Sequence, residues 1–153
     1  MPFALHSPAF QNGGAIPEKY VRDGDNVSPP LRWSDPPAEA KSFVLMVEDP
    51  DAPQGTFRHW AVHGIDAGQK ELPEGAGSGQ AAPAPQAVND FGKARYDGPQ
   101  PPPGHGVHHY HFRLAALDVP QLDVPPGAKA ASVWDAARPH MIGETEIVGT
   151  FAR

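Results

Sequence analysis

The chain has 153 residues with a formal net charge of −6, and it contains twenty prolines, sixteen glycines and no cysteine. Its length suits one domain, its proline content disfavours a bundle of long helices, and the lack of cysteine excludes disulfides, iron–sulfur clusters, thiolate zinc sites and a cysteine nucleophile. The negative charge, with no cluster of Lys and Arg, gives no electrostatic basis for binding nucleic acid or an anionic membrane surface.

Short apolar runs with β-branched and aromatic residues predict strands along most of the chain. In order, the predicted strands cover residues 3–5, 31–33, 44–48, 57–65, 107–117 and 147–151, and one helix is predicted over residues 128–137. These elements include too few helices for repeated parallel crossovers, so we expect a mainly β fold whose strands are antiparallel. In the strand over residues 57–65, alternation groups Phe57, His59, Ala61 and His63 on one face, opposite Trp60 and Val62.

The N-terminus lacks a basic segment followed by an apolar stretch, and no run approaches the ~18 apolar residues of a membrane-spanning helix. We therefore expect a cytoplasmic protein with no membrane insertion.

A Gly-, Pro- and Ala-rich connection covers residues 66–106, and a loop of this length in a small domain is usually functional or disordered. Residues 99–103 within it read Pro-Gln-Pro-Pro-Pro. Because proline has no N–H, Gln100 is the only one of the five whose backbone can donate a hydrogen bond. Such a stiff segment is either a rigid spacer or, close to His108 and Tyr110, a donor suited to an anion.

Two carboxylates, Asp49 and Asp51, follow the predicted strand over residues 44–48, in backbone held by Pro50 and Pro53. Asp and Pro are ordinary turn residues, so the segment could be only a turn. A functional role for either carboxylate requires partners elsewhere in the chain.

Four of the eight histidines fall within residues 105–111, and they could supply those partners. Strand alternation directs His108, Tyr110 and Phe112 to one face and His109, His111 and Arg113 to the other. Since Phe112 is apolar, the first face is expected to be buried, and His108 and Tyr110 then need polar partners there. Asp49 or Asp51 would serve, although His108 could equally satisfy a hydrogen bond of the core.

His109 and His111 share a face, which is one way to present two imidazoles to a metal ion. Two ligands do not make a site, and Arg113 on the same face would repel a cation. We therefore predict a solvated pair and no metal site.

Several separate motifs occur in one order along the chain, at residues 16–20, 26–33, 49–53, 57–60, 89–92, 96–99, 106–110 and 148–151. Together they resemble the phosphatidylethanolamine-binding protein family, in its short bacterial form that is described as Raf-kinase-inhibitor-like. The match runs nearly from end to end. It implies a single domain over residues 1–153, folded as a Greek-key-like antiparallel β-sandwich with a few short helices, and a small anion pocket near one end.

The resemblance also implies which residues line that pocket. Asp49 matches the first aspartate of the family's DPDAP motif, and His59 and His108 match its two pocket histidines. Tyr110 matches a tyrosine two residues after the second histidine, and Gln100 occupies the position whose backbone N–H faces the phosphate. With the neighbouring Asp51, the predicted ligand-binding residues are Asp49, Asp51, His59, Gln100, His108 and Tyr110. We expect Asp49 to be ionised and to hold His59 or His108 as a donor; the alternative is a protonated Asp49 that itself donates.

The chain departs from the family pattern at two positions near the pocket. His109 stands where the family has arginine, which removes a permanent positive charge. Gln100 stands where bacterial relatives often carry cysteine. We also expect no counterpart of the C-terminal segment that covers the pocket in mammalian members, since the sequence ends at Arg153.

These features together predict a protein that binds a small anion, such as phosphate, a phosphomonoester or a phospholipid headgroup, without a cofactor. A phosphorylated protein partner, including one in kinase signalling, would present the same group, and the resemblance is compatible with a homodimer. The alternative is a hydrolase or other enzyme that uses Asp49, His59 and His108 as acid and base groups. That enzyme would lack an obvious nucleophile, because the chain has neither cysteine nor a Gly-x-Ser-x-Gly motif.

Overall fold

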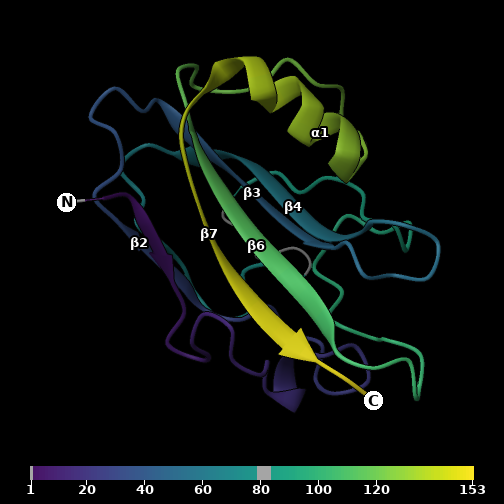
Figure 1. Cartoon of the computed structure of the whole chain (residues 1–153). Coiled ribbons are helices and arrows are strands. Elements are labelled where there is room, and N and C mark those ends of the chain that lie inside the picture. Colours follow the sequence, from purple (N-terminus) through teal and green to yellow (C-terminus); the bar gives the residue numbers. More distant parts are fainter. Residues whose placement is uncertain (1, 79–83) are drawn as a thin grey trace.

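The computed structural model describes residues 2–78 and 84–153, and its strands form two antiparallel sheets (Figure 1). One sheet has the strand order β1-β2-β5 and the other has the order β4-β3-β6-β7. The strands are β1 (Ala4–His6), β2 (Leu31–Ser34), β3 (Ser42–Asp49), β4 (Phe57–Asp66), β5 (Glu71–Leu72), β6 (His108–Leu117) and β7 (Met141–Phe151). The helices are the 3₁₀ turns η1 (Glu18–Tyr20) and η3 (Arg138–His140) and the α-helix α1 (Ala130–Ala137). The predicted antiparallel β architecture with short helices is confirmed.

The main hydrophobic core lies between the two sheets. Buried side chains from β2 and β5 meet alternate residues of β3 and β6, among them Leu31, Trp33, Leu72, Phe43, Leu45, Val47, Phe112 and Leu114. The Trp33 and Phe43 rings, with centroids 5.5 Å apart, join the two layers. This core fixes which face of β6 is buried, and it confirms that His108, Tyr110 and Phe112 point inward.

A second core lies on the opposite face of the four-stranded sheet, where α1 covers the strands (Figure 1). Val44 and Met46 of β3 pack there with Val133 and Trp134 of the helix. Because both faces of β3 are covered, the strand is a nearly continuous apolar run instead of an alternating one. In the described part of the chain, no helix combines the length and the apolar character that crossing a bilayer requires.

Strand β4 contains an irregularity that simple alternation does not predict. Val47 pairs with Trp60 and Glu48 pairs with Arg58, so His59 is an extra residue in β4 at a β-bulge. The bulge turns both His59 and Trp60 toward the space between the sheets, where the His59 ring lies 5.4 Å from that of Tyr110. Ala61 instead packs in the second core. The predicted grouping of His59 with Ala61 on one face is therefore wrong.

Several predicted boundaries also shift. Strand β7 begins at Met141, six residues before the predicted start. The prediction missed its first half because that part has no apolar run and joins the sheet as an edge strand through its pairing with β6. The helix begins at Ala130, and β5 and η1 were not expected. Two β-bridges join the long connection after β4 to other parts of the chain, because Gln86 pairs with Val62 and Val88 pairs with Lys129. Residues 79–83 of that connection lie outside the described residues.

Candidate functional site

A cavity of about 190 Å³ lies at the end of the four-stranded sheet where β3 ends and β4 and β6 begin. Antiparallel pairing brings these three strand ends together, although β6 is far from β3 and β4 in the sequence. Its lining residues are Asp49, Ala52, Pro53, Phe57, His59, Phe91, Gln100, Pro101, Pro102, His108 and Tyr110. The structure thus brings five of the six predicted site residues to one cavity, and only Asp51 lies outside its lining.

Asp49 and His108 form a buried pair at the base of the cavity. The Oδ2 atom of Asp49 lies 2.6 Å from Nδ1 of His108, and the two residues are 3% and 1% exposed. The other carboxylate oxygen, Oδ1, accepts the backbone N–H of Asp51 at 2.8 Å. Both oxygens therefore have hydrogen-bond partners, as an ionised carboxylate prefers. The Asp49 carboxylate orients His108, and not His59.

His105 is a further member of this cluster that sequence reasoning missed. Its Nδ1 lies 2.6 Å from Nε2 of His108, so both ring nitrogens of His108 are engaged. His105 stands on an exposed turn between Gly104 and Gly106, whose φ angles of +75° and +93° are accessible mainly to glycine. The Gly-His-Gly sequence three residues before His108 was the available signal.

His59 is fixed by a hydrogen bond to the backbone on the other side of the cavity. Its Nδ1 lies 2.8 Å from the carbonyl oxygen of Asp97, and the side chain is almost fully buried. A carbonyl can only accept, so Nδ1 carries the proton and the neutral ring has its lone pair on Nε2. Burial lowers the pKa of His59, against smaller raising effects of the Asp97 hydrogen bond and the Asp49 charge.

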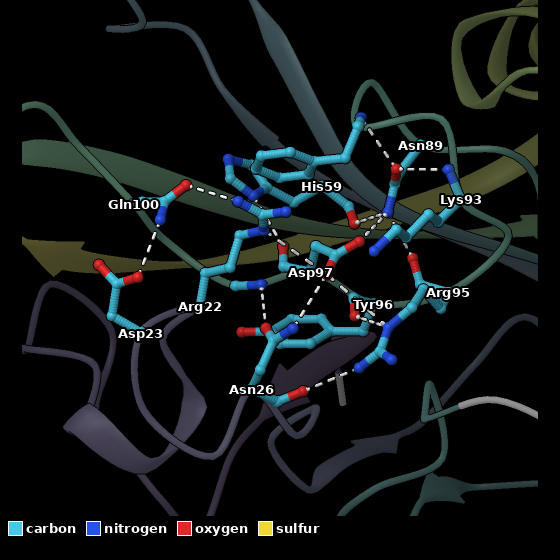
Figure 2. Close-up of polar contacts among 12 residues, drawn as sticks. Arg22, Asp23, Asn26, His59, Asn89, Lys93, Arg95, Tyr96, Asp97 and Gln100 are labelled. Carbon is cyan, nitrogen blue, oxygen red and sulfur yellow. Dashed lines mark hydrogen bonds and ion pairs between the residues drawn. The ribbon is translucent and has the colours of Figure 1, made fainter.

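The backbone carbonyl of Asp97, which accepts from His59, is held in place through the buried side chain of the same residue. A network of polar residues surrounds the Asp97 carboxylate (Figure 2). The side-chain amides of Asn26 and Asn89 donate to its two oxygens at 2.9 and 2.8 Å. Arg22 and Arg95 lie 3.8 and 3.7 Å from the carboxylate through their Nε atoms. These residues belong to or adjoin the motifs that carry the family resemblance, but the sequence alone assigned no role to Asn26, Asn89 or Asp97.

The side chain of Gln100 points away from the cavity, toward Arg22 and Asp23 (Figure 2). Its Oε1 accepts from Arg22 at 2.8 Å, and its Nε2 donates to Asp23 at 2.9 Å. The backbone N–H of Gln100 makes no hydrogen bond to any other described residue. The next carbonyl, that of Pro101, accepts from Nε of Arg153 at 2.6 Å. Side-chain contacts of Gln100 therefore anchor the segment, and Gln100, Pro101 and Pro102 line the cavity.

Aromatic rings form much of the remaining wall. The Phe57 ring lies 4.7 Å from that of Phe91 and 5.0 Å from that of His59. The guanidinium of Arg22 sits 4.1 Å from the centroid of Phe91, as a cation–π contact. Tyr110 also lines the cavity, and burial raises its pKa, so its hydroxyl stays protonated and is a hydrogen-bond donor. The walls are thus mainly apolar, with a few polar groups, as is common in ligand sites.

Asp51 pairs instead with His109 on the outer face of the sheet. Its Oδ2 accepts from the backbone N–H of His109 at 2.8 Å and lies 2.9 Å from Nδ1 of the same residue. These hydrogen bonds lower the pKa of Asp51. His111 lies next to Glu146, a different carboxylate, at 3.4 Å. Over residues 2–78 and 84–153, no group of three or more His, Asp or Glu residues is placed to hold a metal ion.

Comparison with known proteins assigns the fold and the motifs to one family. The family model for phosphatidylethanolamine-binding protein matches residues 6–152. The chain belongs to the phosphatidylethanolamine-binding protein family. The matched range includes every residue that lines the cavity.

Relatives within the phosphatidylethanolamine-binding protein family include several bacterial proteins. The chain is 42% identical to a UPF0098 protein of Aquifex aeolicus, over 97% of this chain and 88% of that one. It is 40% identical to the UPF0098 protein YbhB of Escherichia coli, over 97% and 99% of the two chains. A putative lipoprotein of Mycobacterium tuberculosis, LppC, is also 40% identical, over 98% of this chain and 72% of that one.

Solved structures of the family have the same fold. Escherichia coli YbcL, described as a member of the mammalian family, superposes with a TM-score of 0.95 at 32% identity, covering 100% of this chain and 99% of that one. The homologue CT736 of Chlamydia trachomatis gives a TM-score of 0.89 at 38% identity, covering 99% and 98%. The predicted family and its β-sandwich are therefore confirmed.

Proposed function

We propose that the cavity binds a small oxyanion, namely phosphate or the phosphoryl group of a larger molecule. The observation that carries this proposal is the pair of donors at one small cavity: the Gln100 N–H and the Tyr110 hydroxyl. A backbone N–H held in a stiff segment and a protonated phenol are both suited to oxygen atoms of an anion. The family name refers to a lipid whose headgroup contains a phosphodiester, and the chemistry that it shares with this proposal is the phosphoryl oxygen.

Charge around the cavity indicates that the binding is weak. Among the described residues that line it, none is Lys or Arg, and the Asp49 charge is adjacent to the bound group. Two or three neutral hydrogen bonds contribute about 0.5–1.5 kcal/mol each. The upper end of the summed range, about 4 kcal/mol, corresponds to a Kd on the order of 1 mM, so we expect a Kd of that order or weaker. A phosphorylated partner would gain affinity only from contacts outside the cavity.

An enzyme reaction at the same residues is less well supported. The Asp49–His108 pair has the arrangement of a carboxylate that orients a general base. However, Nε2 of His108 is bonded to His105 and does not face a substrate in this conformation. The described lining residues also include no aliphatic hydroxyl, thiol or primary amine that could act as a nucleophile.

Two substitutions of Gln100 test the proposed donor directly. In Gln100→Pro the N–H of the segment is removed, and phosphate binding should weaken about tenfold or more. Gln100→Ala loses the same side-chain contacts with Arg22 and Asp23 but keeps the N–H, so it serves as the matched control. The measurement is a chemical-shift titration with sodium phosphate at constant ionic strength.

In the wild type and in Gln100→Ala, the titration should move the backbone signal of position 100 and the signals of His59 and Tyr110 together. A loss of equal size in both variants would mean that the side chain, and not the N–H, is responsible. Unmoved signals in the wild type at high millimolar phosphate would refute anion binding at this cavity.

A further inference from the structure

We propose that the cavity selects an oxyanion that still carries a proton, which means the monoanion of phosphate or of a phosphomonoester, and discriminates against sulfate and phosphodiesters. The inference rests on the proposed function, because it concerns the ligand of the same cavity. It follows from whether each polar group that lines the cavity donates or accepts a hydrogen bond, and above all from His59.

His59 presents an acceptor to the cavity. Its Nδ1–H is committed to the Asp97 carbonyl at 2.8 Å, and that carbonyl is fixed because Asp97 and His59 also pair through Asp97 N–H and the His59 carbonyl at 3.2 Å. A rotation of the ring that offered Nδ1–H to a ligand would leave the Asp97 carbonyl opposite a lone pair. Nε2 makes no hydrogen bond with any described residue, so its lone pair is available to a ligand hydroxyl.

Asp49 adds to the acceptor side of the cavity, whereas Gln100 and Tyr110 form the donor side. The carboxylate of Asp49 accepts from Asp51 and His108, and neither of its oxygens has a proton to donate while it is ionised. A fully deprotonated oxyanion satisfies the donors but sets its lone pairs against these acceptors. A ligand with one P–O–H satisfies both sides, because it accepts from the donors and donates to Nε2 of His59.

The charged groups packed around His59 do not make it a cation. Asp49 faces it from β3, and the backbone of Asp97 and Gly98 faces it from the connecting segment. All three favour the imidazolium. The Asp97 carboxylate is already stabilised by hydrogen bonds from Asn26 and Asn89 and by two nearby arginines. Tyr110, which faces His59 from β6, is neutral. Burial outweighs these effects and lowers the pKa of His59, which supports the acceptor role that the geometry assigns.

The test compares probes that differ in whether they can carry a proton. At about pH 5.5, below the second pKa of about 6 of a phosphomonoester, inorganic phosphate and methyl phosphate are largely monoanions with a P–O–H. Dimethyl phosphate is a monoanion of equal charge but has no P–O–H group, because both of its ester positions are filled, as in a phospholipid headgroup. Sulfate has the tetrahedral shape of phosphate but carries no proton at this pH. We expect both proton-free probes to bind about tenfold more weakly or worse, since each leaves a buried acceptor unpaired.

Variants of two histidines on β4 provide the control. His59→Gln places an amide near the position of Nε2, and because an amide can present either NH₂ or C=O, phosphate and sulfate should then differ by less than about threefold. His63→Gln alters the half-buried histidine on the same strand outside the cavity lining and should keep the full discrimination. In the wild-type complex, nitrogen chemical shifts of His59 report directly whether Nε2 is unprotonated, whatever the stability of the His59 variant.

The outcomes separate the two proposals. Sulfate and phosphate bound equally well by the wild type, or a protonated Nε2 in the phosphate complex, would overturn the selection of a protonated ligand and leave oxyanion binding intact. Dimethyl phosphate bound as tightly as methyl phosphate would overturn it equally and would assign the cavity to phosphodiesters. No binding of any of the four probes would overturn both proposals.

Discussion

The backbone assigns the proton of His59 before any ligand arrives. Its hydrogen bond to the Asp97 carbonyl places the single proton of the neutral ring on Nδ1. Burial favours that neutral ring and outweighs the opposite effect of the hydrogen bond, so the native state binds a second proton less readily than the unfolded chain does. The free energy of unfolding therefore depends on pH, and the direction of that dependence follows from the lowered pKa of His59.

We predict that the free energy of unfolding decreases as the pH falls below 6.5, the ordinary pKa of histidine. Between that value and the lowered pKa of His59 in the folded protein, the unfolded chain binds more protons, so stability rises with pH across this window and is complete above it. Urea unfolding at a series of pH values measures the slope. His63 contributes in the same direction, because burial lowers its pKa also.

The His63→Gln variant removes that second contribution and isolates the slope that belongs to His59. In His59→Gln the slope should become shallower than in the wild type. Parallel pH profiles of the wild type and His59→Gln would contradict the neutral buried state of His59.

Neighbouring residues on β6 should differ sharply in their importance, because strand alternation sends them to opposite faces. We predict that His108→Ala lowers the free energy of unfolding by about 3–5 kcal/mol, since it leaves the buried Asp49 carboxylate without its partner. His109→Ala breaks an exposed pair with Asp51 and should cost less than about 1 kcal/mol. Urea unfolding near neutral pH measures both, and losses of equal size would show that the buried pair contributes no more than the exposed one.

At the scale of elements, the segment of residues 97–103 is placed by close contact with residues 20–26. Gly98 donates its N–H to the Asn26 side chain at 2.8 Å, and Arg22 donates to the Pro99 carbonyl at 3.0 Å. A Cβ at Gly98 would collide with the Tyr20 carbonyl oxygen. The segment therefore reaches the cavity only because a residue without a side chain stands at this crossing.

Gly98→Ala should displace the segment and lower the free energy of unfolding by about 1–3 kcal/mol, as overpacking does in well-packed interiors. It should also shift the amide signal of Gln100, two residues away. Gly68→Ala is the matched control, because a Cβ there meets only the Asp66 side chain at an ordinary contact distance of 3.5 Å. If both variants were equally stable, the close approach would not be what positions the segment.

Elements differ in how well their own sequence predicts them. β3 and β6 were predicted to within two residues because a buried strand needs a short, apolar, β-branched run, and alternation placed His108 and His109 correctly. The bulge at His59 could not be predicted, since it is created by the register with β3 and leaves no local pattern. The first half of β7 was missed because hydrogen bonds to β6, and not apolar side chains, hold it in the sheet.

At the scale of the whole molecule, the cavity is assembled from segments that meet only in the fold. Family motifs predicted five lining residues, and the lone N–H of Gln100 followed from the proline run alone. The contacts that give those residues their chemistry could not be predicted from one sequence. His105 reaches His108 from an exposed turn, and Asp97 acts on His59 through a backbone carbonyl, which has no residue-type signature.

The pairing of β3 with β6 at the centre of the larger sheet has a consequence for how the chain folds. These strands are separated by most of the middle of the sequence, so closing the loop between them costs entropy before either strand gains its partner. The hairpin of β3 and β4 is local and can form first. Asp49 and His108 meet only after the distant strands have paired, so we infer that the cavity forms after the β3–β4 hairpin.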